Sequence, residues 1–314
     1  MSKYLIDGTT NSHTEQNSGP YLDDKFWPNW DRDLKNLKDV LIKHEHEGTP
    51  FSVLRVSHSE FIALEAGTSQ RPQGGNFQGR HSSGNTLSHE LLLKFLKSID
   101  GADRLSTQIG WDFLHWAGRV ANILDTYKSN PHATEWPNMT HYTSLDMVVD
   151  IPMDMIYGLC ANRWFFRTFK NKIGLIGAGP KLDVIKKLMD YEEYQEYLGC
   201  DYFTDYIRLP QRQALDDTGL EDMVRKGVSQ STCSVFLVGC GVSKLKFWHL
   251  LKDTRNCVFI DIGHGIDLIA GHGELDRPYC GSWINYKVGS EETFGEVDEM
   301  GGASSRGVYK LLNR

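Results

Sequence analysis

Two segments of the chain share one pattern, in which a short apolar run leads through a glycine turn into a helix-like stretch. The first is IGLIGAGPKLDVIKKLM at residues 173–189, and the second is VFLVGCGVSKLKFWHLL at residues 235–251. Such apolar runs, each followed at once by a helix, are typical of parallel strands that are buried on both faces. The repeat therefore predicts a parallel sheet whose strands are connected by crossover helices.

The rest of the chain supplies further elements for the same sheet. Strands are expected at 51–56, 202–209 and 257–263, and helices at 34–48, 89–100, 111–127, 154–168 and 220–228. The alternation predicts an α/β, Rossmann-like fold with a mostly parallel sheet flanked by helices. We expect a single α/β domain over residues 23–290, preceded by a flexible segment at 1–22 and followed by a tail at 291–314.

Composition limits which classes of partner the protein can bind and in which cellular compartment it is expected. The chain has 314 residues and a net charge of −7, which gives no basic footprint for a nucleic acid. No run of about 20 apolar residues could span a bilayer, and the N-terminal sequence lacks the apolar core of a signal peptide. The six cysteines form no C-x-x-C pair, which favours reduced thiols. These features together predict a soluble, cytoplasmic protein without a transmembrane segment.

The glycine turns are candidates for binding phosphate groups. In parallel α/β sheets, ligands bind outside the carboxyl ends of the strands, and the amides at helix N-termini attract phosphate. The candidate residues are Gly177, Gly179, Lys181, Gly239, Gly241, Ser243 and Lys244. The alternative is that each glycine is needed only for a tight turn between strand and helix.

Dinucleotides and S-adenosylmethionine are the usual ligands of such turns. Neither turn has the third glycine of the G-x-G-x-x-G fingerprint. Asp261 follows the second turn by about 20 residues, where a ribose-binding carboxylate can stand. An NAD- or S-adenosylmethionine-dependent enzyme therefore remains an alternative.

A third segment, FIDIGHGID at residues 259–267, brings titratable groups to a strand end. Asp261 and His264 are three residues apart and accompanied by Gly263, and we expect both side chains to face one cleft. The alternative makes Asp261 a cap of the next helix and His264 a surface loop residue.

Three segments together resemble the GT-D class of nucleotide-sugar-dependent glycosyltransferases. They are VLRVSHSEF, LVGCGVSKLKFWHLL and FIDIGHGID, and the resemblance covers roughly residues 50–272. It implies a Rossmann-like core and a nucleotide-sugar donor, with Arg55 and Ser59 in the donor region. It also implies that Glu60 is the glutamate of the class's Asp-x-Glu motif, and that Asp261, Gly263 and His264 lie at a late strand end.

The motif departs from the class at one position, because His58 stands where the class has an aspartate. The resemblance implies Mn²⁺ or Mg²⁺ bound by His58 and Glu60, to neutralise the leaving diphosphate. Imidazole adds no negative charge, so two alternatives stay open: His58 contacts phosphate directly, or it takes no part. The candidates for the catalytic base are Glu60, Asp261, His264 and Asp112.

The predicted function is metal-assisted transfer of a sugar from a nucleotide-diphosphate donor to a glycan or glycoconjugate acceptor. The resemblance makes a UDP-sugar the expected donor. An inactive nucleotide-binding protein is a further alternative, because the motif has lost its aspartate.

Overall fold

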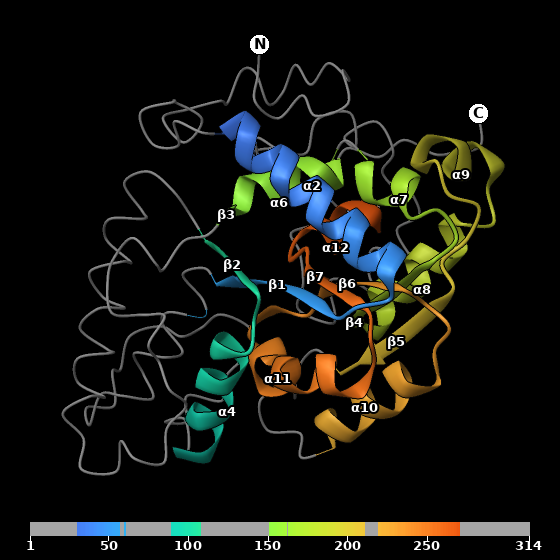
Figure 1. The fold of residues 1–314 in the computed structure, drawn as a ribbon. Coiled ribbons are helices and arrows are strands. Elements are labelled where there is room, and N and C mark those ends of the chain that lie inside the picture. Colours follow the sequence, from blue (N-terminus) through green and yellow to red (C-terminus); the bar gives the residue numbers. More distant parts are fainter. Residues whose placement is uncertain are drawn as a thin grey trace, which may run out of the picture.

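The computed structural model describes residues 30–56, 60, 89–107, 151–161, 163–210 and 219–270. Within these residues the chain forms one seven-stranded, all-parallel sheet in the order β3-β2-β1-β7-β6-β4-β5 (Figure 1). The strands are β1 (Phe51–Val56), β2 (Arg104–Thr107), β3 (Ile151–Pro152), β4 (Ile173–Ala178), β5 (Asp205–Leu209), β6 (Val235–Gly239) and β7 (Val258–Asp261). The predicted α/β, Rossmann-like architecture is confirmed.

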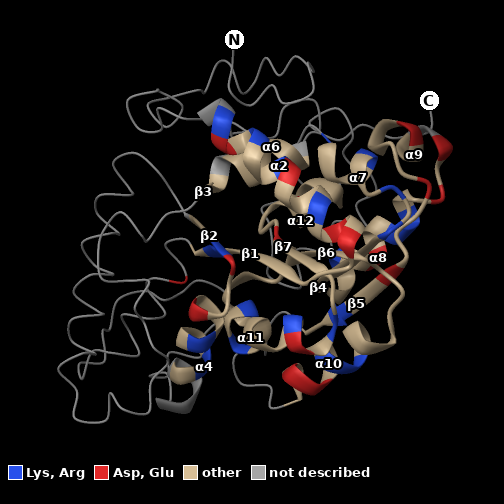
Figure 2. Cartoon of the chain, in the orientation of Figure 1, with Lys and Arg blue, Asp and Glu red and all other residues tan. Residues whose placement is uncertain are grey.

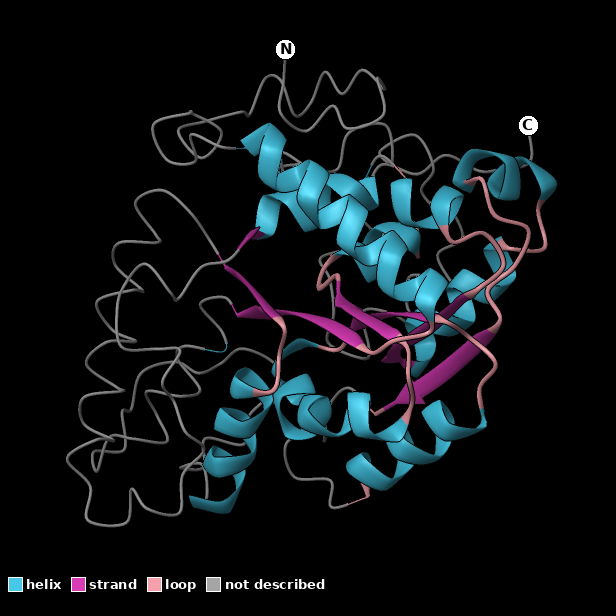
Figure 3. Ribbon diagram, viewed as in Figure 1, coloured by secondary structure: helices cyan, strands magenta, loops and turns pink. Residues whose placement is uncertain are grey.

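Helices cover both faces of the sheet (Figures 1 and 3). One face packs against α2 (Trp30–Glu47), α6 (Met153–Ala161), α7 (Trp164–Thr168), α8 (Gly179–Leu188), α9 (Glu192–Leu198) and α12 (Gly265–Ile269). The other packs against α4 (His89–Asp100), α10 (Leu220–Gln230) and α11 (Lys244–Thr254), the last of which follows a short 3₁₀ turn, η5 (Gly241–Ser243).

The apolar runs form strands because each one supplies side chains to two cores at once. In β6, Val235 and Leu237 belong to the α2 side, whereas Phe236 and Val238 belong to the α11 side. Phe236 also stacks on Phe259 of β7, with ring centroids 5.4 Å apart. All five residues of β6 are buried, as expected for a central parallel strand.

Charged residues of both signs are interspersed along the helices, whereas the strands carry few of them (Figure 2). None of the helices in the described ranges is long and apolar enough to cross a membrane. One group of charged side chains lies at the carboxyl ends of β1 and β7, where the candidate site is.

Several elements differ from the prediction, and β2, β3 and α9 were not predicted. The single helix predicted at 154–168 is two helices, α6 and α7, because the backbone of Arg163 is left-handed, with φ at 63°. The strands predicted at 202–209 and 257–263 are shorter, at 205–209 and 258–261. The lead-in predicted at 1–22, the tail at 291–314 and the helix at 111–127 lie outside the described residues.

Candidate functional site

Three neighbouring strands, β1, β7 and β6, bring charged side chains to one edge of the sheet. Arg55 is the last but one residue of β1, Asp261 is the last residue of β7, and Lys244 begins α11, just after β6. Glu60 lies four positions beyond the end of β1. Because the strands are parallel, their carboxyl ends meet, and residues up to 206 positions apart in the chain come into contact.

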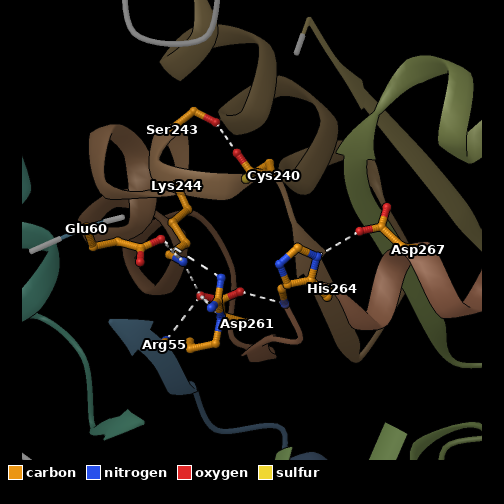
Figure 4. A network of polar contacts seen from close by, with 9 residues as sticks. Arg55, Glu60, Cys240, Ser243, Lys244, Asp261, His264 and Asp267 are labelled. Carbon is orange, nitrogen blue, oxygen red and sulfur yellow. Dashed lines mark hydrogen bonds and ion pairs between the residues drawn. The ribbon is translucent and has the colours of Figure 1, made fainter. Parts of the chain in front are cut away.

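Lys244 is at the centre of this group, shown in Figure 4. Its Nζ lies 2.7 Å from Glu60 Oε1 and 2.6 Å from Asp261 Oδ2. The lysine and glutamate side chains are 0% exposed and that of Asp261 is 1% exposed. The ammonium therefore joins two buried carboxylates that come from different segments of the chain.

The backbone fixes the orientation of Asp261. Its Oδ2 accepts a hydrogen bond from the backbone N–H of Arg55 at 3.1 Å, and its Oδ1 accepts one from the backbone N–H of Gly263 at 2.9 Å. Both carboxylate oxygens are thus engaged. Asp261 does not cap α12, whose N-cap is His264.

The Arg55 guanidinium completes the group. Its Nη2 lies 3.9 Å from Glu60 Oε1, and its Nε lies 3.8 Å from Asp261 Oδ2. The guanidinium packs directly on Gly263, where a Cβ atom would lie 2.5 Å from Arg55 Nε. Gly263 also has a φ of +48°, so this position needs glycine for its backbone as well as for the space.

We call Arg55, Glu60, Lys244 and Asp261 the buried ion cluster. It contains two cations and two anions, so its formal charge is zero. Removal of four charges from water is costly, and mutual pairing is what compensates for that cost.

The cluster does not fit a divalent metal ion while Lys244 is in place. Mg²⁺ and Ca²⁺ bind carboxylate oxygens at about 2.0–2.6 Å, and Lys244 already bridges the facing oxygens of Glu60 and Asp261. At an effective dielectric constant of about 20, a dication about 4 Å from one ammonium is repelled by roughly 8 kcal/mol. Within the described ranges, no group of three or more His, Cys, Asp and Glu side chains is arranged to hold a metal. His58, the other predicted ligand, lies outside those ranges.

A second polar group lies beside the cluster and contains His264 and Asp267, from the segment that follows β7 (Figure 4), and Lys181 of α8. The Nδ1 atom of His264 is 3.1 Å from Asp267 Oδ2, and Lys181 Nζ is 2.5 Å from Asp267 Oδ1. His264 has 43% of its side chain exposed, whereas Asp267 has 11% and Lys181 has 9%. The prediction that Asp261 and His264 face one cleft is wrong in this respect, because Asp261 is buried against Lys244 and His264 turns to Asp267.

The carboxyl group of Asp267 is held in its ionised form. Burial alone would raise its pKa, but the neighbouring Lys181 ammonium and the contact with His264 outweigh burial, so the pKa lies well below its usual range. A permanent negative charge next to Nδ1 favours a proton on that nitrogen, which leaves the lone pair on Nε2.

The glycine turns are occupied largely by the protein itself. A Cβ atom at Gly239 would lie 2.6 Å from Cβ of Ile266, and one at Gly177 would lie 3.1 Å from the Gly239 carbonyl oxygen and 3.4 Å from Ile266. A Cβ atom at Gly179 would lie 3.2 Å from Nη2 of Arg208. The close packing of α12 therefore accounts for Gly177 and Gly239 without a ligand, whereas Gly179 meets the end of the Arg208 side chain of β5.

The second turn has features of its own. Gly241 has a φ of +60°, which favours glycine, and the Ser243 hydroxyl donates to the Cys240 carbonyl oxygen at 2.5 Å. Burial raises the pKa of the Cys240 thiol to about 12, and the charge of Asp261 adds to the effect. The thiol stays protonated at neutral pH, so Cys240 is no candidate nucleophile.

Most of the predicted site residues do come together, in roles that the sequence did not specify. Arg55, Glu60, Lys244 and Asp261 form one cluster, and Gly263 supports it. Lys181 and His264 meet at Asp267, which the prediction did not include, although the His-x-x-Asp spacing of a helix start was visible in FIDIGHGID. Ser59 and Asp112 lie outside the described residues.

No protein family, no curated protein and no solved structure gives a significant match to this chain. The function must therefore be argued from the geometry of the site.

Proposed function

We propose that this protein is a glycosyltransferase that moves a sugar from a nucleotide-diphosphate donor to a hydroxyl group of a glycan or glycoconjugate. The observation that carries the proposal is the buried ion cluster. The three segments that resemble the GT-D class, distant in sequence, supply Arg55 and Glu60, Lys244, and Asp261 to that one cluster. The donor then lies over the carboxyl ends of β1, β7 and β6, where α/β sheets bind their ligands.

His264 is the group best suited to act as the base. A transfer by direct displacement needs a group that accepts the proton of the acceptor hydroxyl as its oxygen attacks the anomeric carbon and the nucleoside diphosphate leaves. In this proposal Nε2 of His264 takes that proton. Asp267 fixes the ring through Nδ1 and stabilises the imidazolium that forms, while Lys181 holds Asp267 in place.

Glu60 and Asp261 are poorly placed for the same role. Both are buried, and both share the Lys244 ammonium at 2.7 Å or less. Their exposed fractions are 0% and 1%, so an acceptor hydroxyl group has little access to either carboxylate. Their part in the proposal is to hold Lys244 and Arg55 at the edge of the sheet.

The dinucleotide and S-adenosylmethionine alternatives gain no support from the site. A ribose-binding carboxylate needs an oxygen that a ribose hydroxyl group can reach, and the Asp261 side chain is 1% exposed and paired with Lys244. The glycines that such ligands would approach pack against Ile266 and Arg208 instead.

Ligand binding followed by turnover tests the proposal. We expect UDP or GDP to raise the melting temperature of the protein more than NAD or S-adenosylmethionine does, because binding to the folded state stabilises it. Stabilisation by NAD or S-adenosylmethionine alone would refute the proposal.

Turnover is then measured as release of the nucleoside diphosphate from nucleotide sugars, with and without glycan acceptors. His264→Gln should lower the rate by about 100-fold or more and leave nucleotide binding unchanged. His44→Gln is the matched control, because His44 lies in the last turn of α2 and contacts Thr49 and Phe51, away from the site. An unchanged rate in His264→Gln would remove His264 from the mechanism.

A further inference from the structure

We infer that Lys244, with Arg55, takes the place of the divalent cation, so that the donor diphosphate binds to this protein without Mn²⁺ or Mg²⁺. The inference rests on the proposed function for the identity of the ligand. It concerns a separate property, the source of the positive charge at the carboxylate pair.

The first argument is the position of the Lys244 ammonium. Nζ lies between two carboxylate oxygens from separate segments, 2.7 Å from Glu60 Oε1 and 2.6 Å from Asp261 Oδ2. A bridging cation would have to occupy that same space between the two oxygens. The lysine is fully buried, so its ammonium is held there by the surrounding protein.

The second argument is charge. A dication bound by two carboxylates makes a neutral site. Two protein cations, Lys244 and Arg55, with the carboxylates of Glu60 and Asp261 make a neutral site as well. The cluster therefore already has the charge balance that a metal would provide, and an added dication would leave it with two uncompensated positive charges.

The third argument comes from the sequence. His58 stands where the GT-D class has the aspartate of its Asp-x-Glu motif, so the motif has lost one negative charge. A hard divalent ion binds oxygen ligands in preference to imidazole, and the loss weakens the motif for such an ion. The buried ion cluster takes its cations from Lys244 and Arg55, so it needs no such metal ligand.

Calorimetric titration of the full-length wild-type protein with UDP and with GDP tests the inference directly. We expect the dissociation constant to agree within about threefold between EDTA and Mn²⁺. Binding that is at least about tenfold tighter with Mn²⁺ would overturn the inference and leave the proposed function intact. If neither nucleotide binds under either condition, the proposed function fails, and the metal titration that follows still decides the role of Lys244.

Titration of the protein with Mn²⁺ alone needs no knowledge of the donor. Electron paramagnetic resonance measures the free ion at each point of the titration. Wild-type protein should show no stoichiometric site that depends on Glu60, whereas Lys244→Met should gain a site, because it exposes the two carboxylates to the ion. The gain should be at least about tenfold in affinity and should disappear in Glu60→Gln/Lys244→Met.

Lys252→Met is the matched control. Lys252 lies on the same helix and pairs with Asp103 at 2.9 Å, so its replacement also removes a lysine–carboxylate pair but should create no metal site. A stoichiometric Mn²⁺ site in the wild type that Glu60→Gln abolishes would overturn the inference, even if Lys244→Met fails to fold. A folded Lys244→Met variant with no gain in Mn²⁺ binding would overturn it too.

Discussion

Replacement of Lys244 by methionine should destabilise the protein strongly. The substitution keeps the unbranched stem of the side chain, one atom shorter, and removes its charge, so the buried ion cluster changes from two cations and two anions to one cation and two anions. Breaking a buried ion pair by removal of one partner costs about 3–5 kcal/mol, since a buried charge is left uncompensated. The total stability of a domain is about 5–15 kcal/mol, so much of the stability of this chain depends on one side chain.

A second substitution separates the charge effect from lost packing. Glu60→Gln/Lys244→Met leaves Arg55 with Asp261, one cation with one anion, and so restores neutrality. We expect the double variant to be more stable than Lys244→Met by about 1–3 kcal/mol, the range of coupling between residues in one network. Lys252→Met should cost about 1 kcal/mol or less, because its partner Asp103 is partly exposed to solvent.

Urea unfolding followed by tryptophan fluorescence measures these differences, and the chain contains eight tryptophans. With a slope of about 2 kcal/mol per molar urea, a loss of about 4 kcal/mol lowers the midpoint by about 2 M. Equal midpoints for Lys244→Met and Lys252→Met would refute the cluster's contribution. A double variant whose losses simply add would show that Lys244 and Glu60 are not coupled.

Two further predictions concern the turns and the segment after β7. Gly239→Ala should lower stability by about 1–3 kcal/mol, and by more than Gly177→Ala. The added Cβ would lie 2.6 Å from Ile266 at position 239, but 3.1 Å from its nearest neighbour at position 177. The reverse order of the two variants in urea unfolding would contradict the packing argument. Lys181 lowers the pKa of Asp267, so the ionised carboxylate stabilises the fold above the unfolded pKa of about 3.9, and this stabilisation is lost as the pH falls toward the lower folded pKa. Lys181→Met should therefore be less stable than the wild type at neutral pH, and it should lose less stability than the wild type below about pH 4. Parallel curves of unfolding free energy against pH for the two proteins would contradict the pairing.

The sequence was sufficient for the architecture because the relevant signals are local. Each central strand is an unbroken apolar run, and in β6 alternate residues feed opposite cores. The break between α6 and α7 was not predictable in this way. It depends on the left-handed backbone of Arg163, whose guanidinium lies 4.4 Å from the centroid of the Tyr197 ring, a contact that only the tertiary fold creates.

The site shows the same division between local and distant information. Position in the chain pointed to Lys244 and Asp261, and the resemblance to the GT-D class pointed to Arg55 and Glu60; each was expected to be available to a ligand. The structure pairs them with one another instead, across separations of 184 residues for Lys244 and Glu60. Which cation meets which carboxylate depends on the order of β1, β7 and β6 in the sheet, and the sequence does not state that order.

The repeated strand–turn–helix unit acquires a common role from these pairs. Lys181 follows the first glycine turn and binds Asp267, and Lys244 follows the second and binds Asp261. Asp261 and Asp267 lie on either side of His264, at the two ends of one short segment. The two repeats therefore hold that segment at both ends. Gly177 and Gly239 add to this by admitting Ile266 of the same segment. If the proposed reaction is correct, a segment fixed at both ends keeps the His264 backbone in one place from one turnover to the next, which is the condition that a positioned base must meet.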